Sequence, residues 1–114
     1  VWTIGIGSGG TPWAAGVSPD TREVRAIELV APVLTALEEL AERHPDGPIA
    51  EMFRNPRWRL EYGDGRRALS RGEERYDIIQ ADAILPESSQ SGLLYSEEFL
   101  QAVRRRLAPG GLYI

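Results

Sequence analysis

An apolar run that passes directly into a cluster of glycines is the feature that most constrains how this chain can fold. The chain opens with Val1-Trp2-Thr3-Ile4 and continues as Gly5-Ile6-Gly7-Ser8-Gly9-Gly10. A short apolar run followed by glycines predicts a buried strand that enters a tight turn. Thr11 is suited to cap a helix that has Pro12 at its first position. The start of the chain therefore predicts a strand, a glycine-rich turn and a helix, in that order.

The rest of the chain repeats this alternation of strands and helices. Further strands are expected over Val24–Leu29, over Trp58–Tyr62, which alternates, over Tyr76–Asp82, and from Leu112 onward. Helical segments are expected from Pro32, around Ile49–Phe53, over Arg66–Ser70 and after Ser96, with a polar loop over Ala83–Gly92. Such alternation implies parallel pairing with right-handed crossovers. We therefore expect an α/β fold, a Rossmann-like, doubly wound and mainly parallel sheet of about five strands.

Length and charge narrow the classes of function that remain. The 114 residues fit one domain, 1–114, and because both ends fall inside apolar runs we expect a piece of a longer protein. A net charge of −4 argues against binding to nucleic acid, which needs clustered basic residues. The chain has no cysteine, and we expect no metal site. We also expect no contact of this segment with a membrane, and a cytoplasmic location.

The carboxyl ends of the first two predicted strands carry the first candidate binding residues. In a doubly wound sheet, ligands bind beyond these ends. Gly5, Gly7, Ser8 and Gly9 would let the backbone approach a ligand closely, although a tight turn without a ligand would use the same residues. Glu28 ends the second strand, where a carboxylate can accept hydrogen bonds from both hydroxyls of a ribose. Together they favour a nucleotide, with NAD still open at this point.

The next two strands end in acidic residues as well. Asp64 and Gly65 follow the third strand, where the carboxylate could accept from an adenine amino group and the glycine would leave space for the ring. The alternative is an ordinary Asp-Gly turn. Asp82 ends the fourth strand, and it would either cap the following loop or face the reacting group.

Taken as a set, six motifs resemble the spermidine synthase family, the polyamine aminopropyltransferases, and especially its divergent bacterial members. They are Gly5–Gly10, Glu28, Gly63-Asp64-Gly65-Arg66-Arg67, Tyr76–Asp82, Leu94-Tyr95-Ser96-Glu97-Glu98-Phe99 and Leu107-Ala108-Pro109-Gly110-Gly111. The resemblance implies the sheet of the S-adenosylmethionine-dependent methyltransferase type and a role in polyamine biosynthesis. It also implies decarboxylated S-adenosylmethionine, or S-adenosylmethionine itself, as co-substrate, an amine as second substrate, and no metal. It is compatible with a homodimer.

The same resemblance assigns roles to the candidate residues. It implies that the glycine turn lies near the sulfonium, that Glu28 holds the ribose, and that Asp64 with Gly65 reads the adenine. Asp82 matches the catalytic aspartate of the family, which binds and deprotonates the attacking amine. A carboxylate is needed there because a free amine, with a reference pKa of about 10, is mostly protonated near neutral pH and cannot attack as a cation.

One departure from the family pattern keeps other functions open. Family members that make spermidine continue the catalytic aspartate with a second aspartate, whereas Leu85 stands at that position here and only Glu87 follows nearby. An S-adenosylmethionine-dependent methyltransferase is the first alternative, since the same fold serves both nucleotides. It would have to hold the amino-acid carboxylate, for which the glycine turn offers no basic residue. A non-catalytic nucleotide-binding domain is the second alternative.

Overall fold

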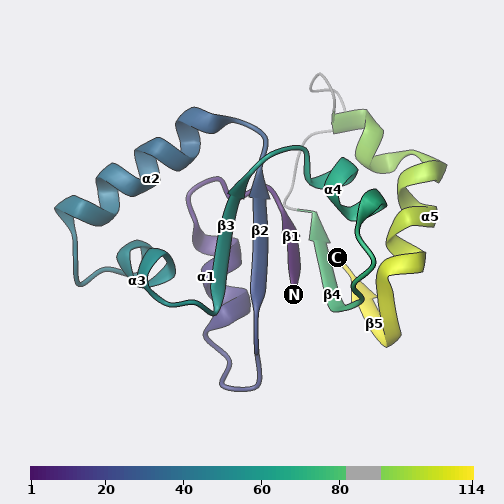
Figure 1. The fold of residues 1–114 in the computed structure, drawn as a ribbon, viewed down its shortest axis with the longest axis horizontal. Helices are drawn as coiled ribbons and strands as arrows, with labels where there is room; N and C mark the ends of the chain where they lie inside the picture. The colour runs from purple at the N-terminus through teal and green to yellow at the C-terminus, as the bar shows by residue number, and fades with distance from the viewer. Residues whose placement is uncertain (82–90) are drawn as a thin grey trace.

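The computed structural model describes residues 1–81 and 91–114, which form a parallel sheet with helices on both faces (Figure 1). The strands are β1 (Trp2–Ile4), β2 (Val24–Glu28), β3 (Trp58–Tyr62), β4 (Tyr76–Ala81) and β5 (Leu107–Tyr113). The helices are α1 (Gly10–Gly16), α2 (Ala31–Arg43), α3 (Pro48–Arg54), α4 (Gly65–Arg71) and α5 (Glu97–Arg106), with a short 3-10 helix, η1, over Ser91–Tyr95.

The strand order of the sheet is β3-β2-β1-β4-β5, and every pair is parallel. The chain builds outward from β1 to β3, then returns to the other side of β1 and builds outward again through β4 and β5. The order of the strands therefore reverses between β1 and β4, which is where doubly wound sheets bind their ligands. The predicted α/β Rossmann-like class is confirmed.

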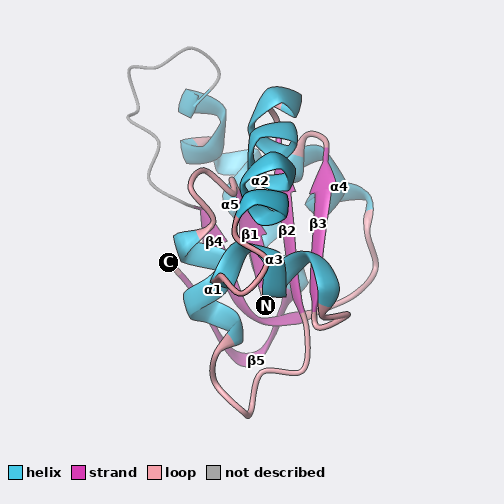
Figure 2. Cartoon of the chain, turned by 90° about the vertical axis from the view of Figure 1, so that its left-hand side faces the viewer, coloured by secondary structure: helices cyan, strands magenta, loops and turns pink. Residues whose placement is uncertain are grey.

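Two layers of helices enclose the sheet, as the perpendicular views of Figure 1 and Figure 2 show. On one face, Trp2, Ile4 and Ile79 pack with Leu69 of α4 and Phe99 of α5. On the other face the buried residues come from the strands and from α2 and α3, namely Ile6, Ala26, Leu37, Val24, Met52 and Trp58. Alternate residues of β1 and β2 point to opposite faces, and because helices cover both faces, all of β1 and most of β2 are buried.

Helix α1, which follows the glycine turn, is fixed to the sheet by two tryptophans. Trp58 donates from Nε1 to the carbonyl of Pro12 at 2.8 Å, and its ring stacks on Trp13 with centroids 5.3 Å apart. Gly16 lies so close to Trp58 that an added Cβ would come within 2.3 Å of the ring. The C-terminal end of α1 is thereby held at a fixed distance from β3.

Several boundaries differ from those expected from the sequence. Thr11 does not cap α1: the helix already begins at Gly10, and Gly9 takes the cap position in a left-handed conformation without any side-chain cap. The last strand begins at Leu107 rather than Leu112, because the Pro109–Gly111 segment is accommodated as an irregularity in the ladder between β4 and β5. The last two residues of the expected loop, Ser91 and Gly92, are not loop residues but belong to the 3-10 helix η1.

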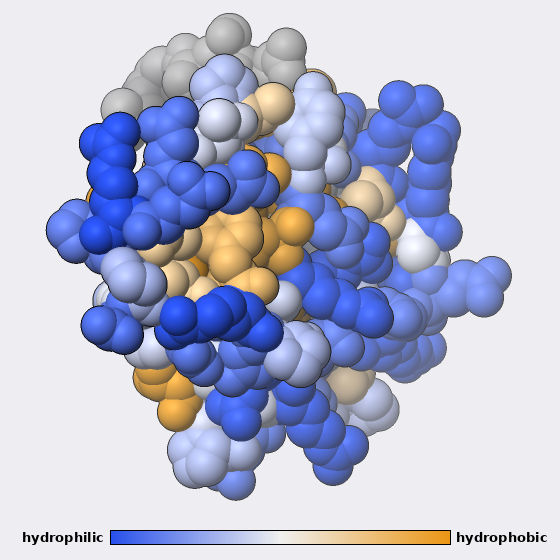
Figure 3. All heavy atoms as spheres, turned by 60° about the vertical axis from the view of Figure 1, so that its left-hand side comes forward, coloured by the Kyte–Doolittle hydropathy of each residue, from blue (hydrophilic) through white to orange (hydrophobic). Residues whose placement is uncertain are grey.

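The side of the molecule that carries α2 and α3 presents an apolar area framed by hydrophilic residues (Figure 3). Leu40 of α2 and Phe53 of α3 are both more than one third exposed. Within residues 1–81 and 91–114, no helix has the length and apolar character needed to cross a bilayer.

Candidate functional site

The parallel pairing brings the ends of β1, β2 and β3 to the same edge of the sheet. Glu28 and Tyr62 are paired in register at the ends of β2 and β3, and Ile4 pairs with Ile27 one position earlier. The glycine turn, Glu28 and the Gly63-Asp64-Gly65 segment consequently lie at this one edge, where doubly wound sheets form their ligand crevice. The fourth expected contributor, Asp82, lies outside the described residues.

The glycine turn is held at both ends and exposed in its middle. Gly5 donates to the carbonyl of Ile27 at 2.8 Å, and Gly9 donates to the carbonyl of Ile6 at 2.9 Å. Gly9 is buried, and a Cβ there would come within 2.6 Å of Ile49. Gly7 and Ser8 are exposed, and no atom lies within 4 Å of the position a Gly7 Cβ would take. The exposed middle of the turn therefore leaves space for a ligand against the backbone.

Glu28 connects the turn to the second strand. Its side chain is buried, with the residue only 8% exposed, and its carboxylate accepts three backbone hydrogen bonds. Oε2 accepts from Ile6 at 2.9 Å and from Gly7 at 3.3 Å, while Oε1 accepts from Val30 at 2.9 Å. These bonds compensate the cost of burying a carboxylate at this place. Glu28 is therefore a buried, hydrogen-bonded carboxylate and not an exposed loop residue.

Asp64 and Gly65 lie at the start of α4. Asp64 caps this helix, because its Oδ1 accepts from the backbone N–H of Arg67 at 3.0 Å. This bond occupies one carboxylate oxygen and leaves Oδ2 able to accept from a ligand. Gly65 is buried against Ile4, which a Cβ would approach to 3.0 Å. A side chain at this position would require Ile4 to shift, so the glycine lets α4 begin close to the end of β1.

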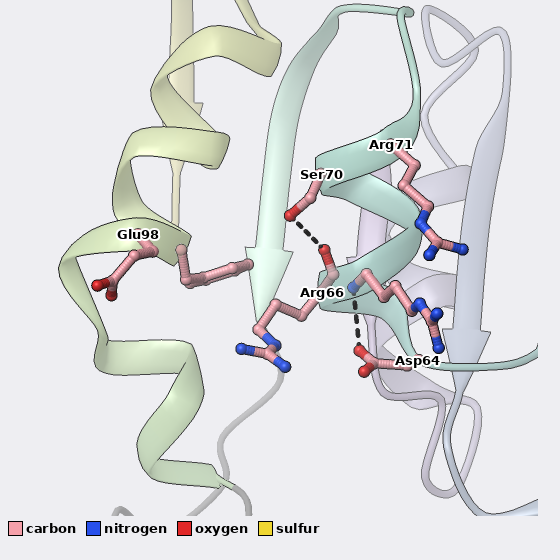
Figure 4. A pocket seen from close by; sticks show the side chains of 7 residues that line it. Asp64, Arg66, Ser70, Arg71 and Glu98 are labelled. Atoms are coloured by element: carbon pink, nitrogen blue, oxygen red, sulfur yellow. Dashed lines mark hydrogen bonds between the residues drawn. The ribbon is translucent and has the colours of Figure 1, made fainter.

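A pocket of about 410 Å³ adjoins Asp64 between α4 and α5, and it is lined by Asp64, Arg66, Arg67, Ser70, Arg71, Glu98 and Phe99. Figure 4 shows that its charged groups do not converge, since Arg66 points toward α5, Arg71 points to the opposite side of α4, and Glu98 points away from α4. The Ser70 hydroxyl is occupied, because it donates to the carbonyl of Arg66 at 2.9 Å. Of the candidate site residues, only Asp64 lines this pocket.

Two exposed apolar residues at this rim were missed by sequence analysis. Leu29 is 51% exposed and Tyr62 is 66% exposed, directly after and directly beside Glu28. The alternation of β3 predicts Tyr62 to be inward-facing together with Trp58. It does lie on that face of the sheet, but at a strand end the helices do not cover. Large apolar side chains on an otherwise polar rim are the signal that could have found them.

The strongly perturbed ionisable groups lie at the opposite end of the sheet, near the starts of β2 and β4. Arg25 makes two hydrogen bonds with Glu61, at 2.8 and 2.9 Å, and this carboxylate raises the pKa of Arg25. Burial raises the pKa of Tyr76 to about 12. These groups stabilise the sheet at a distance from the crevice. Among the described residues, no group of three His, Cys, Asp or Glu side chains is placed to hold a metal ion.

Comparison with protein families gives a match to the spermine/spermidine synthase domain over residues 35–114. Among individual proteins, polyamine aminopropyltransferase 1 of Pseudomonas aeruginosa is 32% identical over all 114 residues. The polyamine aminopropyltransferase of Korarchaeum cryptofilum is 33% identical over the same length. The chain covers 38% and 34% of these two relatives, so it spans little more than a third of their length.

Solved structures show the same arrangement of elements. A spermidine synthase in complex with the transition-state analogue AdoDATO has a TM-score of 0.81 and 25% identity, over 98% of this chain and 36% of that protein. The glycopeptide N-methyltransferase MtfA with S-adenosyl-L-methionine has a TM-score of 0.55 and 21% identity, over 98% of this chain and 44% of that one. The second likeness concerns the fold alone.

Proposed function

This chain belongs to the spermine/spermidine synthase family, and we propose that it forms the nucleotide-binding part of an aminopropyltransferase. The proposed nucleotide is decarboxylated S-adenosylmethionine, and the proposed acceptor is an amine. The observation that carries this proposal is that Glu28, Asp64 and the glycine turn lie at one edge of the sheet, beside the point where the strand order reverses between β1 and β4.

Each part of the proposed nucleotide has a suitable partner at this crevice. The Glu28 carboxylate would accept from the ribose hydroxyls, and the free Oδ2 of Asp64 would accept from the adenine amino group. The backbone N–H of Gly65, at the first position of α4, would donate to a ring nitrogen of the adenine. The exposed Gly7 and Ser8 would approach the sulfonium end, where the absence of a Cβ at Gly7 leaves room.

The proposed reaction is a displacement at carbon. The amine nitrogen attacks the carbon next to the positively charged sulfur, a carbon–nitrogen bond forms, and the carbon–sulfur bond breaks to release methylthioadenosine. Only the unprotonated amine can attack, and we assign Asp82 to attract the substrate ammonium and to take a proton from it before the attack. The nitrogen becomes positively charged again when the new carbon–nitrogen bond forms, as the sulfur loses its charge. This assignment rests on the family resemblance.

The titration of the full-length protein with nucleotides tests the proposal directly. Calorimetry with decarboxylated S-adenosylmethionine, S-adenosylmethionine and methylthioadenosine should show preference for the decarboxylated form and for methylthioadenosine. The physical reason is that the glycine turn has no basic side chain to neutralise the amino-acid carboxylate of S-adenosylmethionine. A preference for S-adenosylmethionine would instead indicate a methyltransferase. Binding of none of them would indicate that the fold is used without this site.

A further inference from the structure

We propose that Glu28 also holds the glycine turn through a hydrogen bond from the Gly7 backbone amide. We further propose that, on nucleotide binding, a ribose hydroxyl replaces this amide as a donor to the Glu28 carboxylate. This inference rests on the proposed function, because it requires a nucleotide with both ribose hydroxyls in the crevice. It follows from a count of the hydrogen-bond acceptor positions of one buried side chain.

The carboxylate of Glu28 is nearly saturated before any ligand binds. A carboxylate offers about four acceptor positions, two on each oxygen. Oε2 already accepts from Ile6 and Gly7, and Oε1 accepts from Val30. One position remains, on Oε1, whereas the two hydroxyls of a ribose need two. When the ribose bridges both oxygens, Oε2 must therefore give up one of its two backbone donors.

The two donors to Oε2 are not equivalent. The bond from Ile6 is 2.9 Å long and buried, and the Ile6 side chain is itself in the core at 1% exposure. The bond from Gly7 is 3.3 Å long and only partly buried, and Gly7 is exposed. Hydrogen bonds lengthened beyond the usual range are weaker, and an exposed N–H can find another partner. Gly7 is therefore the donor that the ribose displaces.

The surrounding structure confines the exchange to a short segment. Gly5 and Gly9 are fixed by their backbone hydrogen bonds to Ile27 and Ile6, and Gly9 packs closely against the Ile49 side chain. The Gly7 N–H belongs to the same peptide as the Ile6 carbonyl, which accepts from Gly9, so this peptide keeps its place and the bond to Oε2 is lost through a small shift of the Glu28 carboxylate. Because Gly7 is exposed, its N–H can then donate to the ligand or to water. Ligand binding thus changes the partner of this amide without rearranging the turn.

Crystal structures of the full-length protein, free and with methylthioadenosine, test the exchange. We expect the Gly7 nitrogen within 3.5 Å of the Glu28 carboxylate in the free protein only. In the complex, both ribose hydroxyls and the Ile6 nitrogen should bond to the carboxylate. A complex in which Gly7 keeps its bond while both hydroxyls also bind Glu28 would overturn the inference, as would a free protein without the Gly7 bond.

A second measurement tests whether Glu28 holds the glycine turn when no nucleotide is bound. In Glu28→Ala the Ile6 and Gly7 amides lose their side-chain acceptor altogether. Hydrogen exchange at these two amides of the free full-length protein should therefore accelerate at least tenfold. Glu39→Ala, on the exposed face of α2, is the matched control and should leave both rates unchanged. Unchanged exchange in Glu28→Ala would show that Glu28 does not hold the turn, even if nucleotides bind normally. Absence of binding in the unchanged protein would instead refute the proposed function, and the ligand exchange with it.

Discussion

At the scale of single residues, Glu28 joins segments that are far apart in the sequence. It ends β2, yet it bonds to Ile6 and Gly7, more than 20 positions earlier. A carboxylate at this place therefore serves the fold and the proposed nucleotide site at once. Its replacement should reveal both roles, because different measurements report on each.

Glu28→Ala should weaken nucleotide binding and destabilise the protein. Loss of the charge-assisted bonds to a ribose should raise the dissociation constant for methylthioadenosine roughly 10- to 100-fold, by analogy with bonds worth about 1.5–3 kcal/mol. Three backbone donors also lose their acceptor, so the free energy of unfolding should fall by about 2 kcal/mol. Calorimetry and urea unfolding measure the two effects. Affinity equal to that of the unchanged protein would remove Glu28 from the ribose subsite.

Asp82→Asn should separate chemistry from binding. Asparagine keeps the size of the side chain but can neither attract a cationic amine by charge nor take its proton. We expect transfer to fall by at least 100-fold, within the range that general base catalysis contributes. The affinity for methylthioadenosine should stay within about twofold. Product formation followed by mass spectrometry gives the rate, with Asp77→Asn at the exposed start of β4 as control. Unchanged turnover would exclude Asp82 from the mechanism.

At the scale of elements, the contact between α1 and β3 determines how the glycine turn continues into its helix. Gly16→Ala places a methyl group within 2.3 Å of the Trp58 ring, which is held by its hydrogen bond to Pro12. Overpacking of this kind should lower the free energy of unfolding by about 1–3 kcal/mol. Gly10→Ala is the matched control in the same helix, since the nearest atom to its Cβ is 3.8 Å away. Equal unfolding midpoints for the two variants would contradict this account.

The elements show which parts of the fold are predictable from sequence. The parallel arrangement of the strands and the number of strands follow from local sequence patterns. So does the cap of α5, because the Ser96 hydroxyl accepts from the backbone N–H of Phe99 at 3.2 Å. The start of α1 was missed because Gly9 replaces a side-chain cap by a left-handed backbone. The early start of β5 depends on its pairing with β4 across an irregular ladder, which no local pattern encodes.

The candidate site also has features that the sequence predicts and features that only the structure reveals. That Glu28 and Asp64 lie at strand ends is visible in the sequence, because strand length and alternation locate those ends. That Glu28 also bonds to Ile6, Gly7 and Val30 depends on the register between β1 and β2, so it required the structure. The same holds for Tyr62, whose exposure depends on how far the helices extend over the sheet.

For the whole molecule, ionisation at alkaline pH involves few kinds of side chain. All 13 basic residues are arginines, and the chain has no cysteine, so tyrosines dominate titration above pH 9. Tyr76 has a structural role, because its ring packs against that of Trp2, with centroids 5.1 Å apart, and its hydroxyl donates to Glu74 at 2.8 Å. Its ring closes the apolar face of the sheet at the start of β4.

The stability of the protein should therefore decline at high pH through Tyr76. Burial raises the pKa of Tyr76 in the folded state to about 12, above its ordinary value of 10.0. The stabilisation is complete below pH 10, and it is lost as the pH rises toward 12, because the unfolded chain ionises first. In Tyr76→Phe this loss is absent, so its stability deficit relative to the unchanged protein should shrink between pH 9 and 11.5. Urea unfolding across this range measures the deficit, with Tyr62→Phe, which removes an exposed hydroxyl, as control. A deficit that stays constant over the whole range would show that ionisation of Tyr76 is not linked to folding.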